Sequence, residues 1–263
     1  MTDAFFGINS ALIAVLLAVI VLLALDRGYR FGLEKQVISH EPIKTQVITI
    51  QGSLLGLISL LLGFAFSVAL HHFDKRSEAV RLEANAIGTT YLRAQSLPEA
   101  VRNETLTTLG RYVDVRVQSS QMSINNEALQ EPLLREASQL RVKLWDLAMK
   151  SLEVDDRITT TGLYIQTLNH LIDSYGTRDE TLNRHVPGLV LFLLLIIIIL
   201  ASGIFGYTSG VEGHRPTMAV MGLMVIFIIV LSMIMDLDRP RRGFIQVSQK
   251  NMLDLQEEIR SSP

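Results

Sequence analysis

The sequence predicts an all-α membrane protein with four transmembrane helices and a membrane-proximal four-helix bundle inserted between the second and third spans. The first observation behind this fold class is that four stretches of the 263-residue chain contain no Asp, Glu, Lys or Arg. The second is their length, because each can cross a hydrocarbon core of about 30 Å as one helix. The third is the absence of the short alternating segments that β-barrels show. The four charge-free runs are Ala4–Leu25, Thr45–Leu70, Val186–Val211 and Pro216–Met235.

The composition excludes several classes of function. The chain has no cysteine, so disulfides, thiolate metal sites and cysteine nucleophiles are excluded. The net charge is −2 without a dense basic tract, which gives nucleic-acid binding no support. The adjacent His71 and His72 would point about 100° apart on a helix, so we expect no metal site there. Phosphate-binding glycine loops and hydrolase or protease motifs are also missing, and we expect neither an enzyme nor a cofactor.

Residues 1–70 contain the first two predicted spans, which a 19-residue loop separates. The second span carries a stripe of small residues at helical spacing, and two interpretations of this stripe stay open. One is close helix–helix packing, which the Gly52-x-x-x-Gly56 step favours. The other is a pore lining in which Phe64 or Phe66 forms a hydrophobic constriction, with no charged ring inside the membrane. The stripe consists of Thr45, Thr49, Gly52, Gly56, Ser59, Gly63 and Ser67.

Residues 71–185 form the insertion, and its apolar residues recur at helical spacing. We predict four helical segments, the first continuous with the second span. An even number of helices returns the chain to the membrane face that it left, so a four-helix bundle closes geometrically. The alternative is that one segment is partly disordered. The segments are marked by Val80–Ala94, Leu106–Val117, Leu133–Leu147 and Ile165–Leu182.

Residues 186–235 are predicted to form a transmembrane helical hairpin, and residues 236–263 a C-terminal tail. The turn at Glu212–Arg215 joins the two helices, and Pro216 suits the first turn of the second. Asp236 and Asp238 lie beside Arg239 at the membrane edge. These charges are either a plain interfacial cluster, or they hold the tail against the bundle or bind lipid headgroups.

A polar pair, Glu83 and Asn85, lies among small residues that include Gly88. This composition favours a tight helix contact around a buried hydrogen-bonding network. A buried glutamate needs a partner. The candidate partners are Arg81, Arg93, Arg111 and Arg116.

Basic residues near the membrane predict the orientation. Nine lie on the side that holds both termini and the insertion, and five lie on the other, which favours a cytoplasmic insertion and cytoplasmic termini. The first span alone argues the reverse, since Asp3 precedes it and Arg27 and Arg30 follow it. The nine are Lys75, Arg76, Arg81, Arg178, Arg184, Arg239, Arg241, Arg242 and Lys250, and the five are Arg27, Arg30, Lys35, Lys44 and Arg215.

Several motifs together resemble a known family. They are Leu62–Ser67, Phe73–Arg76, Glu83–Thr89, Tyr91–Arg93 and Asp236–Pro240 with Gly243. Over about residues 45–255 the sequence resembles the bacterial bestrophin-like domain family, whose function is unknown. The resemblance marks Arg76, Glu83, Asn85, Gly88, Arg93, Asp236, Asp238, Arg239 and Pro240 as structural motif residues.

This family is distantly similar to the bestrophin channels, which are homopentamers with a cytoplasmic helical domain and a pore lined by the second membrane helix. The resemblance therefore implies a homo-oligomer, a pentamer, in the lipid bilayer of the bacterial inner membrane, with small ions as its cargo. The sequence lacks an evident acidic calcium clasp, so calcium gating is not implied. Our alternative interpretation is a membrane-anchored signalling or scaffold protein whose helical bundle binds a partner.

Overall fold

The computed structural model describes residues 10–35, 41–122, 127–239 and 245–261, and the regular structure in these ranges is helical. Four stretches contain a segment long and apolar enough to cross a membrane, and each overlaps one of the four charge-free runs: Leu12–Glu34, Gln46–Ala94, Ile158–Val211 and Met218–Leu237. The described residues divide into two compact units. The span unit lies within residues 1–72 and 185–245, and the helical unit within 73–184 and 246–263.

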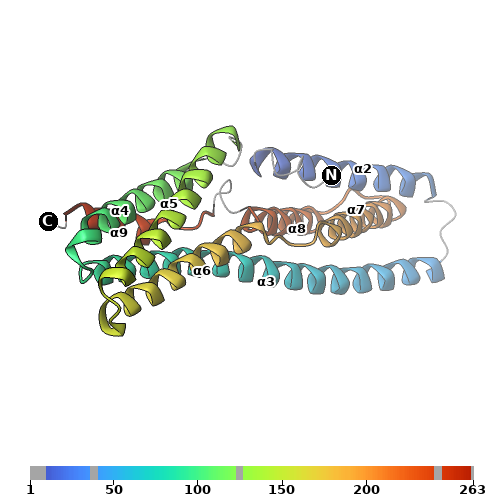
Figure 1. Ribbon diagram of the computed structural model, residues 1–263. Coiled ribbons are helices and arrows are strands. Elements are labelled where there is room, and N and C mark those ends of the chain that lie inside the picture. Colours follow the sequence, from blue (N-terminus) through green and yellow to red (C-terminus); the bar gives the residue numbers. More distant parts are fainter. Residues whose placement is uncertain (1–9, 36–40, 123–126, 240–244, 262–263) are drawn as a thin grey trace. The chain divides into compact units, whose positions relative to one another are not determined.

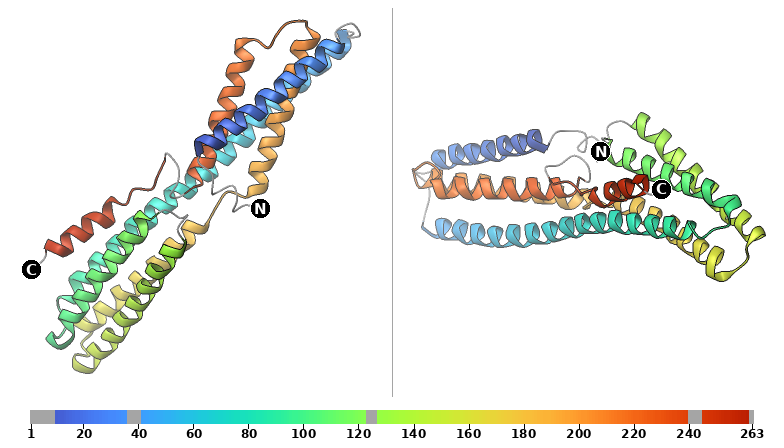
Figure 2. Two further views of the ribbon diagram at one scale, coloured as in Figure 1. Left: turned by 90° about the horizontal axis from the view of Figure 1, so that it is seen from above. Right: turned by 90° about the vertical axis from the view of Figure 1, so that its left-hand side faces the viewer.

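The described residues of the span unit form four helices. They are α2 (Ser10–Lys35), the first part of α3 (Glu41–Ala94), α7 (Gly188–Val211) and α8 (Met218–Leu237). The hairpin of α7 and α8 lies between α2 and this part of α3 (Figures 1 and 2). Gly213 supplies the positive φ of 75° that the turn between α7 and α8 requires.

Two details of the span unit differ from the sequence-based predictions. Pro216 does not lie in the first turn of α8, because Thr217 is the N-cap and its hydroxyl accepts a hydrogen bond from the Val220 amide at 3.4 Å. The predicted 19-residue loop is also wrong, since α2 continues through Arg30 to Lys35. An Arg30–Asp26 ion pair of 2.7 Å, one turn apart, places these charges on a helix rather than in a loop.

Glycines bring α2 and α7 into backbone contact. A Cβ atom built on Gly206 would lie 2.0 Å from the Leu25 carbonyl oxygen, and one built on Gly28 would lie 2.0 Å from the Gly203 carbonyl oxygen. Gly32 and Gly210 face backbone at 2.2 Å in the same way. Small residues at a helix interface permit this approach, because lipid supplies no hydrophobic drive to hold two helices together.

The helical unit contains the rest of α3 and five further elements: α4 (Glu99–Gln121), α5 (Glu127–Val154), the π-helix η2 (Ile158–Gly162), α6 (Leu163–Asn183) and α9 (Lys250–Ser261). Fully buried residues from these helices form one apolar core, with Ile87 of α3, Leu109 of α4, Leu144 of α5 and Leu168 of α6 among them. Apolar burial of this kind is the main favourable contribution to the stability of such a unit.

Residues 236–263 are predicted from the sequence as one tail, and within them α9 packs into the helical unit. Met252 and Leu255 on one side of α9 join the apolar core. On α4, Asp114 accepts hydrogen bonds from Gln256 at 2.6 Å and from Arg260 at 2.7 Å. The C-terminal helix is therefore part of this unit.

Candidate functional site

The small-residue stripe of α3 lies on an exposed face of the helix. Gly52, Gly56, Ser59, Gly63 and Ser67 are all exposed. Of the two aromatic residues nearby, Phe64 is 63% exposed and Phe66 is half-buried. The other face of α3 is turned into the span unit, and its buried residues are Gln51, Ile58, Leu62, Ala65 and Ala69.

The stripe glycines face open space among the residues that the structure describes. A Cβ atom built on Gly52, Gly56 or Gly63 meets no described atom within 4 Å outside the helix's own neighbouring backbone. The glycines of α2 and α7 are the opposite case, because there a Cβ atom would collide with backbone. Within the described chain, the closest helix packing therefore uses other glycines than those of the stripe.

Gln51 is a residue that the sequence analysis missed. Its side chain is 9% exposed, and its Nε2 donates a hydrogen bond of 2.7 Å to Oγ1 of Thr208 on α7. The available signal was an amide inside a charge-free run, since a polar group in hydrocarbon needs a partner. The identity of that partner depends on the fold and could not be deduced from spacing.

Glu83 forms a buried ionic network in the helical unit. Its Oε1 accepts a hydrogen bond of 2.7 Å from Nε of Arg116, and its Oε2 accepts one of 3.1 Å from Nη2 of the same residue. Nη1 of Arg178 also donates to Oε2, while Nη2 of Arg178 donates to Oε1 of Gln249 at 2.9 Å. The carboxylate thus joins α3 to α4 and α6, and Arg178 continues the network to the residue before α9.

Of the four arginines proposed as partners of Glu83, Arg116 is the one that bonds to it. Arg81 lies 4.0 Å from Glu78, and Arg111 lies 2.6 Å from Glu136. Arg93 is exposed. Arg178 is 95 positions from Glu83 along the chain, and no local pattern pointed to it.

The network sets the protonation of Glu83. Burial alone would raise the pKa of this carboxyl, but the charges and hydrogen bonds of Arg116 and Arg178 outweigh burial, and the pKa lies below its ordinary value. Burial also lowers the pKa of Arg178. For Arg116, burial acts in the same direction, but the charge and the hydrogen bonds of Glu83, together with Tyr112 and Tyr175, outweigh it, and the pKa is raised. Glu83 is therefore a carboxylate at neutral pH. It is a structural anchor and not a proton donor.

Arg76 is a second buried arginine, only 1% exposed. It donates hydrogen bonds to the backbone carbonyls of Thr181 at 3.3 Å and of Arg184. These carbonyls belong to the C-terminal end of α6, where helix oxygens lack intrahelical partners and favour a positive charge. Arg76 therefore caps α6 from α3.

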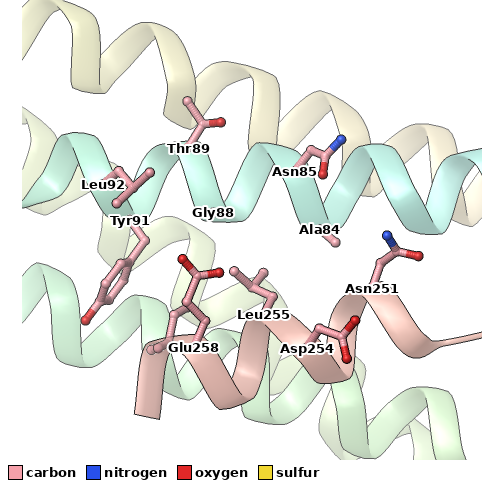
Figure 3. Close-up of a pocket in the computed structure, with 11 residues that line it drawn as sticks. Ala84, Asn85, Gly88, Thr89, Tyr91, Leu92, Asn251, Asp254, Leu255 and Glu258 are labelled. Carbon is pink, nitrogen blue, oxygen red and sulfur yellow. The ribbon is translucent and has the colours of Figure 1, made fainter. Parts of the chain in front are cut away.

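Asn85 and Gly88 lie at a pocket between α3 and α9 (Figure 3). The pocket has a volume of about 290 Å³. Leu255 of α9 faces Gly88, where an added Cβ atom would lie 3.2 Å from the leucine Cδ1. Asp254 and Glu258 contribute carboxylates to the lining. In the part of the chain that the structure describes, no group of three or more His, Asp or Glu side chains could hold a metal ion.

Asp236 and Asp238 are buried at the end of α8 and bind backbone amides. Oδ2 of Asp236 accepts a hydrogen bond of 3.0 Å from the Ile245 amide, and Oδ1 of Asp238 accepts one of 2.9 Å from the Val186 amide. Arg239 is 4% exposed, and Pro240 lies outside the described residues. Both carboxylates therefore anchor chain segments that adjoin α7 and α8.

A comparison with known families shows to which family the chain belongs. The family model of the Bestrophin-like domain matches residues 12–252. The chain belongs to the bestrophin-like family.

Solved structures agree with this membership in the bestrophin-like family. A point variant of a bacterial bestrophin homologue from Klebsiella pneumoniae is 16% identical, with a TM-score of 0.66 over 90% of this chain and 98% of that one. A second structure of a homologue from Klebsiella pneumoniae is 15% identical, with a TM-score of 0.65 over 93% and 97% of the two chains. No curated protein matches the sequence. At this identity the likeness concerns the fold.

The motif residues of this bestrophin-like chain fall in both units. In the helical unit, Arg76 and Glu83 bond α3 to α4 and α6, and Gly88 faces Leu255 of α9. Asn85 is exposed and lines the pocket. In the span unit, Asp236 in the last turn of α8 and Asp238 directly after this helix bind backbone amides. The stripe of α3 is an exposed surface of the span unit.

Proposed function

We propose that the chain is one subunit of an oligomeric ion channel in a bacterial inner membrane, with α3 lining the pore. The observation that carries this proposal is the exposed stripe of α3, where a Cβ atom built on its glycines meets no atom of the described residues within 4 Å outside the neighbouring backbone of the helix. Small and hydroxylated positions on one face of a helix leave room for water and small ions.

The other exposed surfaces of the span unit have a different chemistry. Large apolar side chains such as Leu189 (78% exposed) and Phe192 (60% exposed) on α7 and Ile226 (56% exposed) on α8 suit contact with lipid tails. The stripe has small and hydroxyl side chains instead. Copies of the chain arranged around an axis would use this surface as the wall of a channel, with Phe64 and Phe66 as candidates for its constriction.

Membership in the family supports the remaining parts of the proposal. The resemblance to the bestrophin channels favours a homopentamer that conducts small ions. The excess of basic residues favours a cytoplasmic location for the inserted four-helix bundle and for both termini. The network of Glu83 would then hold the cytoplasmic part of α3 in place.

Ion flux from liposomes tests this function. We expect purified wild-type protein to release an ion gradient, and Gly56→Leu to reduce the flux because a leucine side chain would narrow the pore. Gly222→Leu is the matched control on α8, since a Cβ atom there also meets no described atom within 4 Å outside the neighbouring backbone of the helix. Absence of flux under Na⁺, K⁺ and Cl⁻ gradients would contradict the proposal. If Gly56→Leu changed only the assembly, the scaffold interpretation would be favoured instead.

A further inference from the structure

Gln51 is a buried amide within a predicted span. Besides its 2.7 Å hydrogen bond to Oγ1 of Thr208, its Nε2 lies 3.4 Å from the Ile204 carbonyl oxygen. The Thr208 hydroxyl donates its own proton to the Ile204 carbonyl at 2.9 Å. The hydroxyl can therefore accept from Gln51, because its single hydrogen is already used within α7.

The other buried residues of α3 in the span unit are apolar. Ile58, Leu62, Ala65 and Ala69 are each at most 5% exposed. Apolar contacts depend on area and have no directional preference, so they permit small rotations of a helix about its axis. A hydrogen bond requires a particular distance and angle between donor and acceptor, and it restricts such rotation.

We propose that the hydrogen bond between Gln51 and Thr208 sets the rotation of α3 about its own axis, so that the small-residue stripe is turned away from its own chain. With Gln51 directed at α7, the helical repeat places Gly56, Ser59 and Gly63 about 80–140° around the helix from it. Gln51 is thus a positioning residue. Its importance for conduction rests on the proposed function, but the rotation itself does not.

Cysteine labelling in liposomes measures this rotation, because the natural chain has no cysteine. Ser59→Cys reports the stripe, and Ala65→Cys reports the buried face, where Ala65 is 3% exposed. In the wild-type background a water-soluble maleimide should react much faster at position 59 than at position 65. We expect Gln51→Leu to lower the ratio of the two rates about threefold, which corresponds to losing one interhelical hydrogen bond of average strength in a membrane.

Variants of Thr208 distinguish the hydrogen bond from simple packing. Thr208→Val removes the hydroxyl at nearly constant volume and should lower the ratio as Gln51→Leu does, whereas Thr208→Ser keeps the hydroxyl and should retain the wild-type ratio. The double variant Gln51→Leu with Thr208→Val should add nothing to either single change. An unchanged labelling ratio in Gln51→Leu would overturn the inference. A ratio lowered equally by Thr208→Ser and by Thr208→Val would overturn it as well.

Labelling and ion flux are separate measurements, and their combined outcomes distinguish the two proposals. If wild-type protein conducts no ions but the ratio falls in Gln51→Leu, the positioning role stands and the channel proposal fails. If wild-type protein conducts and the ratio does not change, the channel stands and the positioning role fails.

Discussion

At the scale of single residues, the ionic network of Glu83 is the feature with the largest expected energetic effect. One carboxylate lies between the buried guanidiniums of Arg116 and Arg178. Removing one partner from such a buried network leaves charges without compensation, which destabilises proteins by about 3–5 kcal/mol. The charge of Glu83, and not only its shape, therefore matters for the helical unit.

We expect Glu83→Gln to lower the free energy of unfolding by about 3–5 kcal/mol at pH 7, because two buried guanidiniums lose their counter-charge. Thermal unfolding of the protein in detergent measures this change. Glu78→Gln is the matched control on the same helix. Glu78 forms a 3.2 Å ion pair with Lys75 in which both side chains are about half exposed, and its loss should change stability by less than about 1 kcal/mol. Equal effects of the two substitutions would contradict the role of the buried network.

The same network predicts a pH dependence. Because the pKa of Glu83 is lowered in the folded protein, its contribution to stability is fully present above the unfolded value of about 4.3 and is lost as the pH falls through the lowered folded pKa. Thermal unfolding measured from pH 7 to pH 3 should therefore show a loss of stability on acidification in wild-type protein. That loss should be smaller in Glu83→Gln, and identical pH profiles would refute the linkage.

At the scale of helices, the contact between α2 and α7 depends on glycine. A Cβ atom on Gly206 would lie 2.0 Å from a carbonyl oxygen of α2, so the two helices must separate to accept it. We expect Gly206→Ala to destabilise the span unit by about 1–3 kcal/mol, as overpacking does elsewhere. Thermal unfolding followed by circular dichroism in detergent measures this.

Gly222→Ala on α8 is the control for helix propensity. A Cβ atom at this position meets no atom of the described chain within 4 Å outside the neighbouring helix backbone, so alanine should be neutral or stabilising by up to about 1 kcal/mol. If Gly206→Ala were as stable as Gly222→Ala, the backbone contact between α2 and α7 would not be needed for stability.

Sequence patterns predicted the helices better than their contacts. Runs without charge identified the four candidate spans, because burying an unpaired charge in hydrocarbon is unfavourable whatever the fold. Spacing did not reveal which glycines pack, since Gly52 and Gly56 have the same four-residue step as Gly28 and Gly32 but lie exposed. A step along one helix fixes which residues share a face, whereas the neighbour of that face depends on the tertiary structure.

The same distinction between a helix face and its neighbour explains which contacts of the candidate site could be predicted from the sequence. A buried glutamate required a cationic partner, and Arg116 could be proposed from the sequence. Arg178 meets Glu83, and Gln249 meets Arg178, only in the folded chain. The packing of α9 had a visible signal that the sequence analysis did not use. Met252, Leu255 and Ile259 recur at helical spacing, and all three contact the core of the helical unit.

At the scale of the whole molecule, the proposed channel requires several copies of the chain. One copy exposes the stripe on a single helix and cannot enclose a path by itself. We expect native mass spectrometry of the detergent-solubilised protein to show five copies of the 29.3 kDa chain. A monomer under conditions that preserve ion flux would contradict the axial arrangement.

Blocking flux with a charged thiol reagent tests the central claim most directly, namely that the stripe of α3 faces the conducting path. Wild-type protein has no cysteine and should be insensitive to the reagent. Ile229→Cys, on a side chain of α8 that is 58% exposed, is the control for labelling on the surface assigned to lipid. We predict that the reagent abolishes flux through Ser59→Cys and leaves flux through Ile229→Cys unchanged. Unaltered flux through Ser59→Cys, with complete modification verified by mass spectrometry, would contradict the account.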